Sequence, residues 1–295
     1  MVKRALAPAV VSAVAMLGPS PALADWTMNL REGVTVLSRE IYGLHMLILW
    51  VCVAIAVAVF SVMIYSIATF RKSKGAVPAN FDHSTQAEVI WTLIPVLILV
   101  AMAVPAARTL VRIDDASGSQ LTIKVTGYQW KWQYDYVDEG VTFFSSLART
   151  SDAARQLGSG IDPNSIDHYL LDVDHPLVVP VGKKVRVLVT AADVIHAWWV
   201  PDFGMKKDAI PGYINELWFK ADKVGTYRGQ CAELCGRDHG FMPIVVEVKD
   251  AAGYAAWLAE QKAARSAGVQ PAAKAASLDA PSHDRSQAVL VADAE

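Results

Sequence analysis

Two cysteines, a histidine and a methionine follow one another at short intervals near the carboxyl end of the chain. Cys231, Cys235, His239 and Met242 are separated by four, four and three residues, and His196 lies 35 residues before Cys231. Thiolate, thioether and imidazole ligands together suit copper better than they suit the hard cations that bind oxygen. A mononuclear blue-copper site uses one Cys, two His and a weak axial Met. The second Cys therefore predicts two thiolates that bridge a pair of metal ions.

In such a site each histidine would be the terminal ligand of one metal ion. The Met242 thioether and the backbone carbonyl of Glu233 would be weak outer ligands. When the charge of one electron is shared by two metal ions, the geometry around each ion changes little as that electron arrives or leaves. This favours electron transfer over bond making. Three other interpretations stay open on these residues alone. They are a disulfide outside the cytoplasm, a structural zinc site, for which Met is a poor ligand, and a methionine that only packs in the core.

The segment from Gly229 to Pro243 resembles the dinuclear copper-A loop in subunit 2 of the haem-copper cytochrome c oxidases. The resemblance extends over about residues 30 to 260 and includes Gly127-Tyr128-Gln129-Trp130 and Lys207-Asp208-Ala209-Ile210-Pro211-Gly212. It implies a cupredoxin fold, two copper ions, and a Mg²⁺ ion shared with subunit 1. The implied copper ligands are His196, Cys231, Glu233 through its backbone carbonyl, Cys235, His239 and Met242.

The resemblance also implies roles for residues outside this loop. Trp130 would accept the electron from cytochrome c, Glu88 would lie at the mouth of a proton path into subunit 1, and the side chain of Glu233 would bind Mg²⁺. The acids implied to face the basic surface of cytochrome c are Asp135, Asp174 and Asp193.

Simpler interpretations of the same residues stay open. Glu88 could only favour the positive end of a helix dipole, Trp130 could be one ring of an aromatic strand, and the acids could be solvated surface charges. Two positions depart from the family pattern, because Lys131 stands where another aromatic residue is frequent and Tyr213 stands where an Arg is frequent.

The first 24 residues have the composition of a secretory leader. Lys3 and Arg4 precede a short apolar run that ends in prolines and Ala22-Leu23-Ala24, which predicts a signal peptide over 1–24 with a periplasmic segment over 25–43. The whole chain has 295 residues, is 53% hydrophobic and carries a formal charge of −2. This near-neutral charge argues against nucleic acid as a partner, which requires a basic face.

Two apolar runs predict a transmembrane hairpin. The predicted spans are 44–69 and 89–110, each long enough to cross a hydrocarbon core of about 30 Å. Arg71, Lys72 and Lys74 place the loop over 70–88 in the cytoplasm by the positive-inside rule. The hairpin is either a simple membrane tether or a surface that packs on another subunit.

Beyond the hairpin the pattern changes to short alternating runs rich in Val, Ile, Thr and aromatic residues. They predict an antiparallel β-sandwich or barrel over 113–250, with an inserted surface loop over 145–167. Asp250 then caps a predicted helix over 251–265, and the Ala- and Ser-rich residues 266–295 predict a disordered tail. The expected fold class is a membrane α-helical hairpin followed by an all-β cupredoxin-like domain.

Together these features predict the electron-accepting subunit of a proton-pumping cytochrome c oxidase in a bacterial inner membrane, with the copper domain in the periplasm. Its expected partners are subunit 1, subunit 3, cytochrome c and the lipid membrane. The chain has no C-x-x-C-H haem attachment motif, so it would not complete the reaction alone. Three alternatives compete with this interpretation: a quinol oxidase subunit, which lacks the copper ligands, a soluble copper reductase such as nitrous oxide reductase, and a periplasmic copper carrier.

Overall fold

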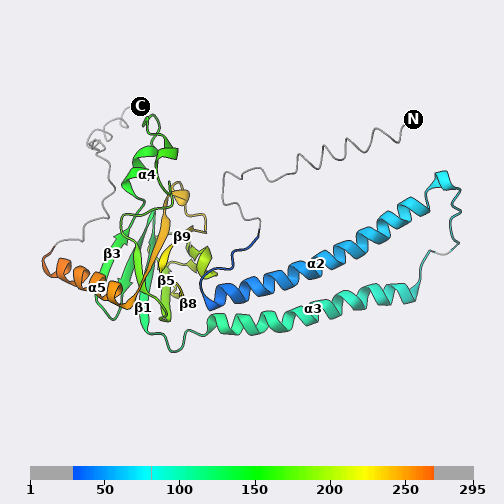
Figure 1. Cartoon of the computed structure of the whole chain (residues 1–295), viewed down its shortest axis with the longest axis horizontal. Coiled ribbons are helices and arrows are strands. Elements are labelled where there is room, and N and C mark those ends of the chain that lie inside the picture. Colours follow the sequence, from blue (N-terminus) through cyan, green and yellow to red (C-terminus); the bar gives the residue numbers. More distant parts are fainter. Residues whose placement is uncertain (1–28, 81, 269–295) are drawn as a thin grey trace, which may run out of the picture. The chain divides into compact units, whose positions relative to one another are not determined.

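A helical hairpin and a β-sandwich make up the computed structural model, which describes residues 29–80 and 82–268 (Figure 1). The predicted leader over 1–24 lies outside the described residues, as do residues 269–295 of the predicted tail. Two long helices come first in the described chain, and ten strands follow them. The fold class is therefore the one that the sequence predicts, a helical hairpin followed by a β-rich domain.

Both hairpin helices are longer than the apolar runs that predict them. Helix α2 spans Val36–Thr69 and begins eight residues before the predicted span at 44. Its early start has a local cause, because Thr35 and Ser38 form a capping box in which each side chain accepts the other's backbone N–H. Helix α3 spans Thr85–Asp114 and is likewise capped before its first residue, by Ser84. Hydropathy alone cannot detect these polar first and last turns.

The two helices are long and apolar enough to cross a membrane. Their 34 and 30 residues correspond to about 51 and 45 Å at 1.5 Å per residue, against about 30 Å of hydrocarbon. Pro95 and Pro105 lie inside α3 without ending it. Neighbouring helices and side chains in a membrane can satisfy the carbonyls that proline leaves free.

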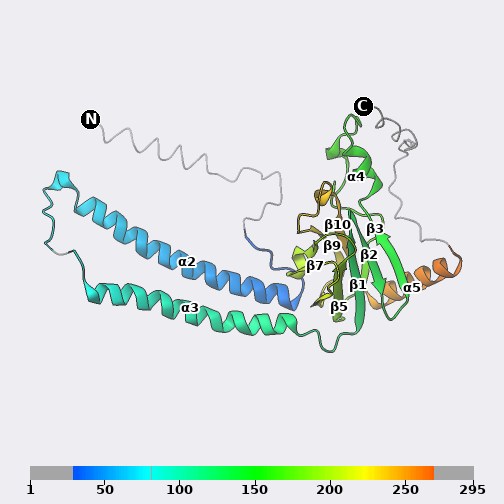
Figure 2. The same cartoon turned by 180° about the vertical axis from the view of Figure 1, so that it is seen from behind.

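Two five-stranded sheets pack face to face in the β-rich domain (Figure 2). The first sheet has the order β3 (Val141–Ser145), β2 (Lys131–Tyr136), β1 (Leu121–Tyr128), β5 (Val185–Ala191) and β8 (Asn215–Phe219). The second has the order β4 (Leu177–Pro180), β10 (Pro243–Lys249), β9 (Gly225–Cys231), β6 (His196–Val200) and β7 (Met205–Ala209). The pairs β1–β5 and β4–β10 are parallel and the others are antiparallel, so the sheets are mixed and not purely antiparallel as the sequence predicts. Residues alternate in burial along β2 and β5, as expected for strands that face a core on one side.

The core between the sheets is rich in aromatic residues. Trp132, Tyr134 and Tyr136 of β2 and Trp198 of β6 are all fully buried. The hydroxyl of Tyr136 donates to the carbonyl of Val178 at 2.6 Å, which satisfies its polar group inside the core. Most of the aromatic run that begins at Tyr128 is therefore structural.

The insertion between β3 and β4 is more ordered than a surface loop. It contains helix α4 (Arg149–Ala154) and the 3₁₀ turn η2 (Pro163–Ser165), within the predicted loop over 145–167. A helix of six residues is too short for hydrophobic periodicity to reveal it. After β10, helix α5 (Ala251–Ser266) coincides with the predicted helix, and Asp250 caps it by accepting from the backbone of Gly253.

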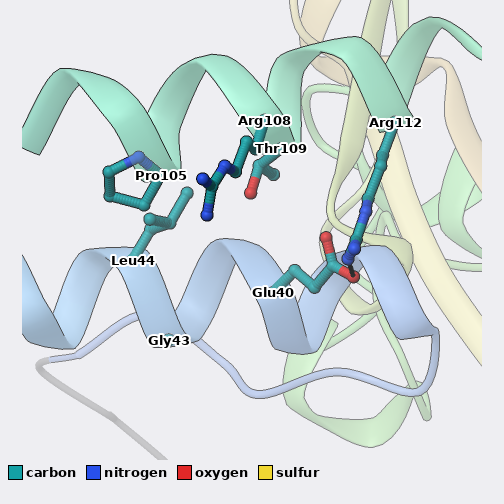
Figure 3. A pocket seen from close by; sticks show the side chains of 7 residues that line it. All are labelled: Glu40, Gly43, Leu44, Pro105, Arg108, Thr109 and Arg112. Atoms are coloured by element: carbon teal, nitrogen blue, oxygen red, sulfur yellow. Dashed lines mark hydrogen bonds and ion pairs between the residues drawn. The ribbon is translucent and has the colours of Figure 1, made fainter.

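The hairpin is attached to the sandwich by contacts at the near ends of both helices. Arg39 of α2 pairs with Asp222, and the indole of Trp218 donates to the carbonyl of Arg112 in α3 at 3.2 Å. Glu40 and Arg112 join the two helices by an ion pair of 2.7 Å (Figure 3). A shallow pocket of about 290 Å³ lies beside this pair, and Figure 3 shows Arg108 pointing into it. Its lining residues are Glu40, Gly43, Leu44, Pro105, Arg108, Thr109 and Arg112.

Candidate metal centre

The candidate ligands come from three neighbouring strands of the second sheet. His196 is the first residue of β6, and Cys231 is the last residue of β9. These strands pair antiparallel with Trp198 opposite Cys231, so the register brings the histidine to the same end as the cysteine. The loop from Cys231 to Pro243 connects β9 to β10 and returns to that same end, where Pro243 pairs with Gln230.

The side chains of the five residues converge. The two sulfur atoms of Cys231 and Cys235 are 3.8 Å apart. The Nδ1 atom of His196 lies 3.9 Å from the Cys231 sulfur, and Nδ1 of His239 lies 3.6 Å from the Cys235 sulfur. The Met242 sulfur is 3.5 Å from that of Cys235. One histidine therefore flanks each thiol, and the thioether lies on one side only.

A sixth predicted ligand atom completes the cluster. The backbone carbonyl of Glu233 lies 3.3 Å from the Cys231 sulfur. The Glu233 side chain itself is exposed. We call the five side chains and this carbonyl the six-residue cluster.

The donor set fits copper better than the open alternatives. Cys231 and Cys235 are free thiols, and their separation of 3.8 Å excludes a disulfide, whose length is about 2.05 Å. The same separation is less than twice a metal–thiolate bond of about 2.3 Å, so one metal ion can contact both sulfurs. The ligand atoms of His196, Cys231 and Cys235 all lie within 4.8 Å of one another. A thioether beside two thiolates and two imidazoles is the soft set that copper prefers.

Asp193 fixes the orientation of His196. Its carboxylate lies 2.9 Å from Nε2 of His196 and also accepts from the backbone N–H groups of Gln129 and Val194. A carboxylate on one ring nitrogen leaves the other nitrogen available to a metal, which here is the Nδ1 atom that faces Cys231. Burial penalises the imidazolium, but the contacts with Cys231 and Asp193 outweigh it and raise the pKa of His196. The D-x-x-H spacing was the only sequence signal for this role, and the resemblance assigned Asp193 to docking instead.

The two thiols differ in acidity. Burial raises the pKa of Cys235 to about 12, and repulsion from the neighbouring Cys231 adds to this. Burial also opposes ionisation of Cys231, but its hydrogen bonds with His196, with the backbone of Glu233 and Ala197, and with His239 together outweigh burial and lower that pKa to about 7. Metal ligation by both sulfurs requires both thiols to lose their protons, so metal binding at this site would release protons.

The backbone leaves no spare space around the histidine. A Cβ atom on Gly127 of β1 would lie 2.8 Å from Cδ2 of His196. Gly236, in the loop, has a φ of 115°, which favours glycine. A glycine at each position thus allows the ligand loop and the imidazole to approach β1 closely.

Comparison with known proteins places the chain in a family. Residues 121–249 match the family described as "Cytochrome C oxidase subunit II, periplasmic domain", and residues 24–108 match its "transmembrane domain". Cytochrome c oxidase subunit 2 of Cereibacter sphaeroides is 39% identical over 233 residues, which cover 76% of this chain and 77% of that protein. The chain belongs to the cytochrome c oxidase subunit 2 family.

Other proteins are also similar to this chain. A probable cytochrome c oxidase subunit 2 of Rickettsia prowazekii (strain Madrid E) is 41% identical over 234 residues, 79% of this chain and 72% of that protein. A solved structure that matches is the crystal structure of the periplasmic domain of subunit II of cytochrome oxidase (CoxB) of Bradyrhizobium japonicum, whose sequence is 46% identical. The match covers 50% of this chain and 97% of the CoxB chain, with a TM-score of 0.43. As a cytochrome c oxidase subunit 2, the chain is a membrane protein and one part of an oxidoreductase complex.

In this subunit 2, Trp130 is in contact with the ligand loop. Its indole N–H donates to the carbonyl of Cys235 at 3.2 Å, and the amide of Gln129 donates to the same carbonyl at 2.9 Å. The ring is partly exposed, and the guanidinium of Arg237 lies 5.6 Å from its centroid. The structure therefore separates Trp130 from the buried rings of β2 and joins it to the loop.

The other predicted positions lie apart from the cluster. Glu88 is exposed in the first turn of α3, consistent with favouring the positive end of the helix dipole. Asp135 accepts from the Thr142 hydroxyl, and Asp174 accepts from the backbone of Ser146. The acids predicted to dock cytochrome c thus each have a local structural partner.

Proposed function

We propose that this chain accepts single electrons from a cytochrome c and passes them to haem in subunit 1, where oxygen is reduced and protons are pumped. The observation that carries the proposal is a pair of free, buried thiols 3.8 Å apart with a histidine next to each. Residues of the six-residue cluster would hold two copper ions, which would supply a one-electron carrier when bound. Such a buried and fully ligated site has no open position for substrate, which suits electron transfer.

Trp130 is proposed as the point where electrons arrive. It is the aromatic ring that is both partly exposed and hydrogen-bonded to a ligand residue, through the carbonyl of Cys235. A basic cytochrome c would be attracted by Asp135, Asp174 and Asp193. Since Asp193 also holds His196, its removal would affect the metal centre as well as docking.

The surface around the ligand loop is proposed to face subunit 1. Large apolar side chains are exposed on three loops near the cluster, and Glu233 is exposed between the two thiols. These exposed residues are Val194, Ile195, Tyr213, Ile214 and Leu234. Glu233 would offer one carboxylate to a Mg²⁺ ion whose other ligands come from subunit 1 and water.

The membrane arrangement follows from the charges that flank the helices. Arg71, Lys72 and Lys74 follow α2 directly, so the loop between the helices is proposed to be cytoplasmic and the sandwich periplasmic in a bacterial inner membrane. Glu88 would then lie at the cytoplasmic side, where a proton path into subunit 1 would begin. The hairpin would pack on subunit 1, with subunit 3 in the same complex.

Copper stoichiometry and electron paramagnetic resonance of the purified full chain test this proposal. We expect two copper ions per chain and a seven-line hyperfine pattern, because one unpaired electron is shared by two nuclei. Cys235→Ser should abolish the pattern, whereas the matched control Cys52→Ser, in α2, should leave it unchanged. A zinc-filled site, or copper that is silent in this measurement under oxidising conditions, would instead favour a structural site or a Cu(I) carrier.

A further inference from the structure

The insertion between β3 and β4 is a fixed part of the sandwich. The hydroxyl of Ser151 in α4 is fully buried and accepts from the backbone of Leu170 at 3.1 Å. The backbone N–H of Ala148 donates to the carbonyl of Asp172, whose carboxylate pairs with Arg228 of β9 at 3.7 Å. Helix α4 is therefore held at its amino-terminal end and at its middle.

Arg155, directly after α4, reaches from this insertion to the ligand loop. Its guanidinium carbon lies 4.5 Å above the ring centroid of Phe241, and one of its nitrogens lies 3.5 Å from the carboxylate of Asp238. Two other nitrogens each lie 2.9 Å from Asp152, which fixes the plane of the group. The side chain is only 23% exposed. Figure 1 shows α4 next to the short gold turn that contains Phe241.

The two residues that Arg155 contacts are direct neighbours of candidate ligands. Asp238 precedes His239, and Phe241 precedes Met242. Asp238 and Met242 flank η4 (His239–Phe241), a 3₁₀ turn of three residues. The side chain of Asp238 makes no capping hydrogen bond to this turn. Short 3₁₀ turns have poor hydrogen-bond geometry. The turn that contains His239 and leads directly into Met242 therefore depends on contacts from outside it.

We propose that Arg155 is a positioning residue that holds η4, and with it the His239 imidazole and the Met242 thioether, in the geometry of the metal centre. A planar guanidinium can stack on an aromatic face and pair with a carboxylate at the same time, which an ammonium cannot do. The inference rests on the proposed copper site. It adds a residue that supports two of the ligands from an insertion about 80 residues before them in the chain.

The test compares variants of the intact oxidase complex that contains this chain. Arg155→Ala removes both contacts, Arg155→Lys keeps the charge, and Phe241→Leu removes the ring face alone. Arg149→Ala is the matched control, because Arg149 is an exposed arginine on the same helix. The measurements are copper retention against a chelator, the hyperfine pattern, the reduction potential of the centre and the melting temperature of the complex.

We expect Arg155→Ala to retain copper about tenfold less well, at the low end of the loss seen when supporting contacts to a metal ligand are removed. The hyperfine pattern and potential should shift in Arg155→Ala and in Phe241→Leu, and Arg155→Lys should restore them only in part. An unchanged pattern and potential in both variants, with only the melting temperature lowered, would overturn the inference. Absence of the two-copper pattern in the unmodified complex would instead refute the proposed function itself.

Discussion

At the scale of single residues, the centre is asymmetric. Met242 contacts the Cys235 sulfur, whereas the carbonyl of Glu233 contacts that of Cys231. A thioether and a carbonyl are both weak ligands, and weak axial ligands tune the potential of copper centres more than they hold the metal. The two metal positions would therefore differ in electronic character even though they share both thiolates.

Met242→Leu tests that asymmetry. Leucine has a similar volume, so the buried packing around Met242 should be kept at a cost below about 1.5 kcal/mol. We expect copper to stay bound, the potential to shift, and onward electron transfer to slow by about tenfold, equivalent to about 1.4 kcal/mol in the barrier. Transfer kinetics and a potential identical to the unmodified chain would remove Met242 from the ligand set.

Trp130→Phe separates electron uptake from metal binding. Phenylalanine keeps an aromatic ring but loses the hydrogen bond to the Cys235 carbonyl, which Gln129 still satisfies. We expect electron uptake from cytochrome c to slow by about tenfold or more, with copper content unchanged. Stopped-flow reduction together with metal analysis would measure both, and loss of copper would show that Trp130 is structural.

At the scale of the elements, the packing of β1 against β6 sets the position of the imidazole. Gly127 of β1 pairs with Trp132 of β2 and with Ala191 of β5, so its backbone cannot move away. His196 is fully buried behind it. The first sheet therefore supports a ligand that belongs to the second sheet.

Gly127→Ala should displace that ligand. The added Cβ would lie 2.8 Å from the ring, and relief of such overpacking costs about 1–3 kcal/mol. We expect a lower melting temperature and weaker copper retention, measured by thermal unfolding and chelator competition. Gly240→Ala is the control, because its added Cβ would meet nothing within 4 Å. Equal copper retention in both variants would contradict this role of Gly127.

At the scale of the whole molecule, net charge says little about the partner, since it is only −2. The local distribution matters more. Arg237 is 82% exposed and lies beside Trp130, so a cation stands at the proposed point of electron uptake. Attraction of a basic cytochrome c would therefore have to come from the proposed docking acids Asp135, Asp174 and Asp193.

Raising the ionic strength should slow capture of a basic cytochrome c, because screening acts over about 8 Å at physiological salt. The association rate constant, measured by stopped flow across a salt series, reports this directly. A rate constant that does not change with salt would contradict electrostatic docking by Asp135, Asp174 and Asp193.

Arg237→Ser should increase the association rate constant for cytochrome c by about two- to threefold at low salt. The substitution removes a positive charge that would repel a basic partner at the docking surface. The copper centre should be unaffected, because the Arg237 side chain is 82% exposed and is not one of the candidate ligands. Slower capture by the variant would indicate a partner that is acidic at this point.

The sequence by itself determined the candidate ligands and the two segments that are apolar and long enough to span a membrane. The types and spacing of Cys231, Cys235, His239 and Met242 are local properties, as are apolar runs long enough for a bilayer. The helix ends were less predictable, because the capping of α2 by Thr35 adds polar turns that hydropathy does not register.

Only the tertiary structure decided how distant segments complete the centre. Strand register places His196 next to Cys231, and the carboxylate of Asp193 orients that histidine. Arg155 contacts Phe241, in the segment between His239 and Met242. The contacts of His196 with Cys231 and of Arg155 with Phe241 join residues that are distant in the chain, and a single sequence contains no periodicity or spacing that reports them. For the same reason, the distance between the two thiols, which excludes a disulfide, became known only from the fold.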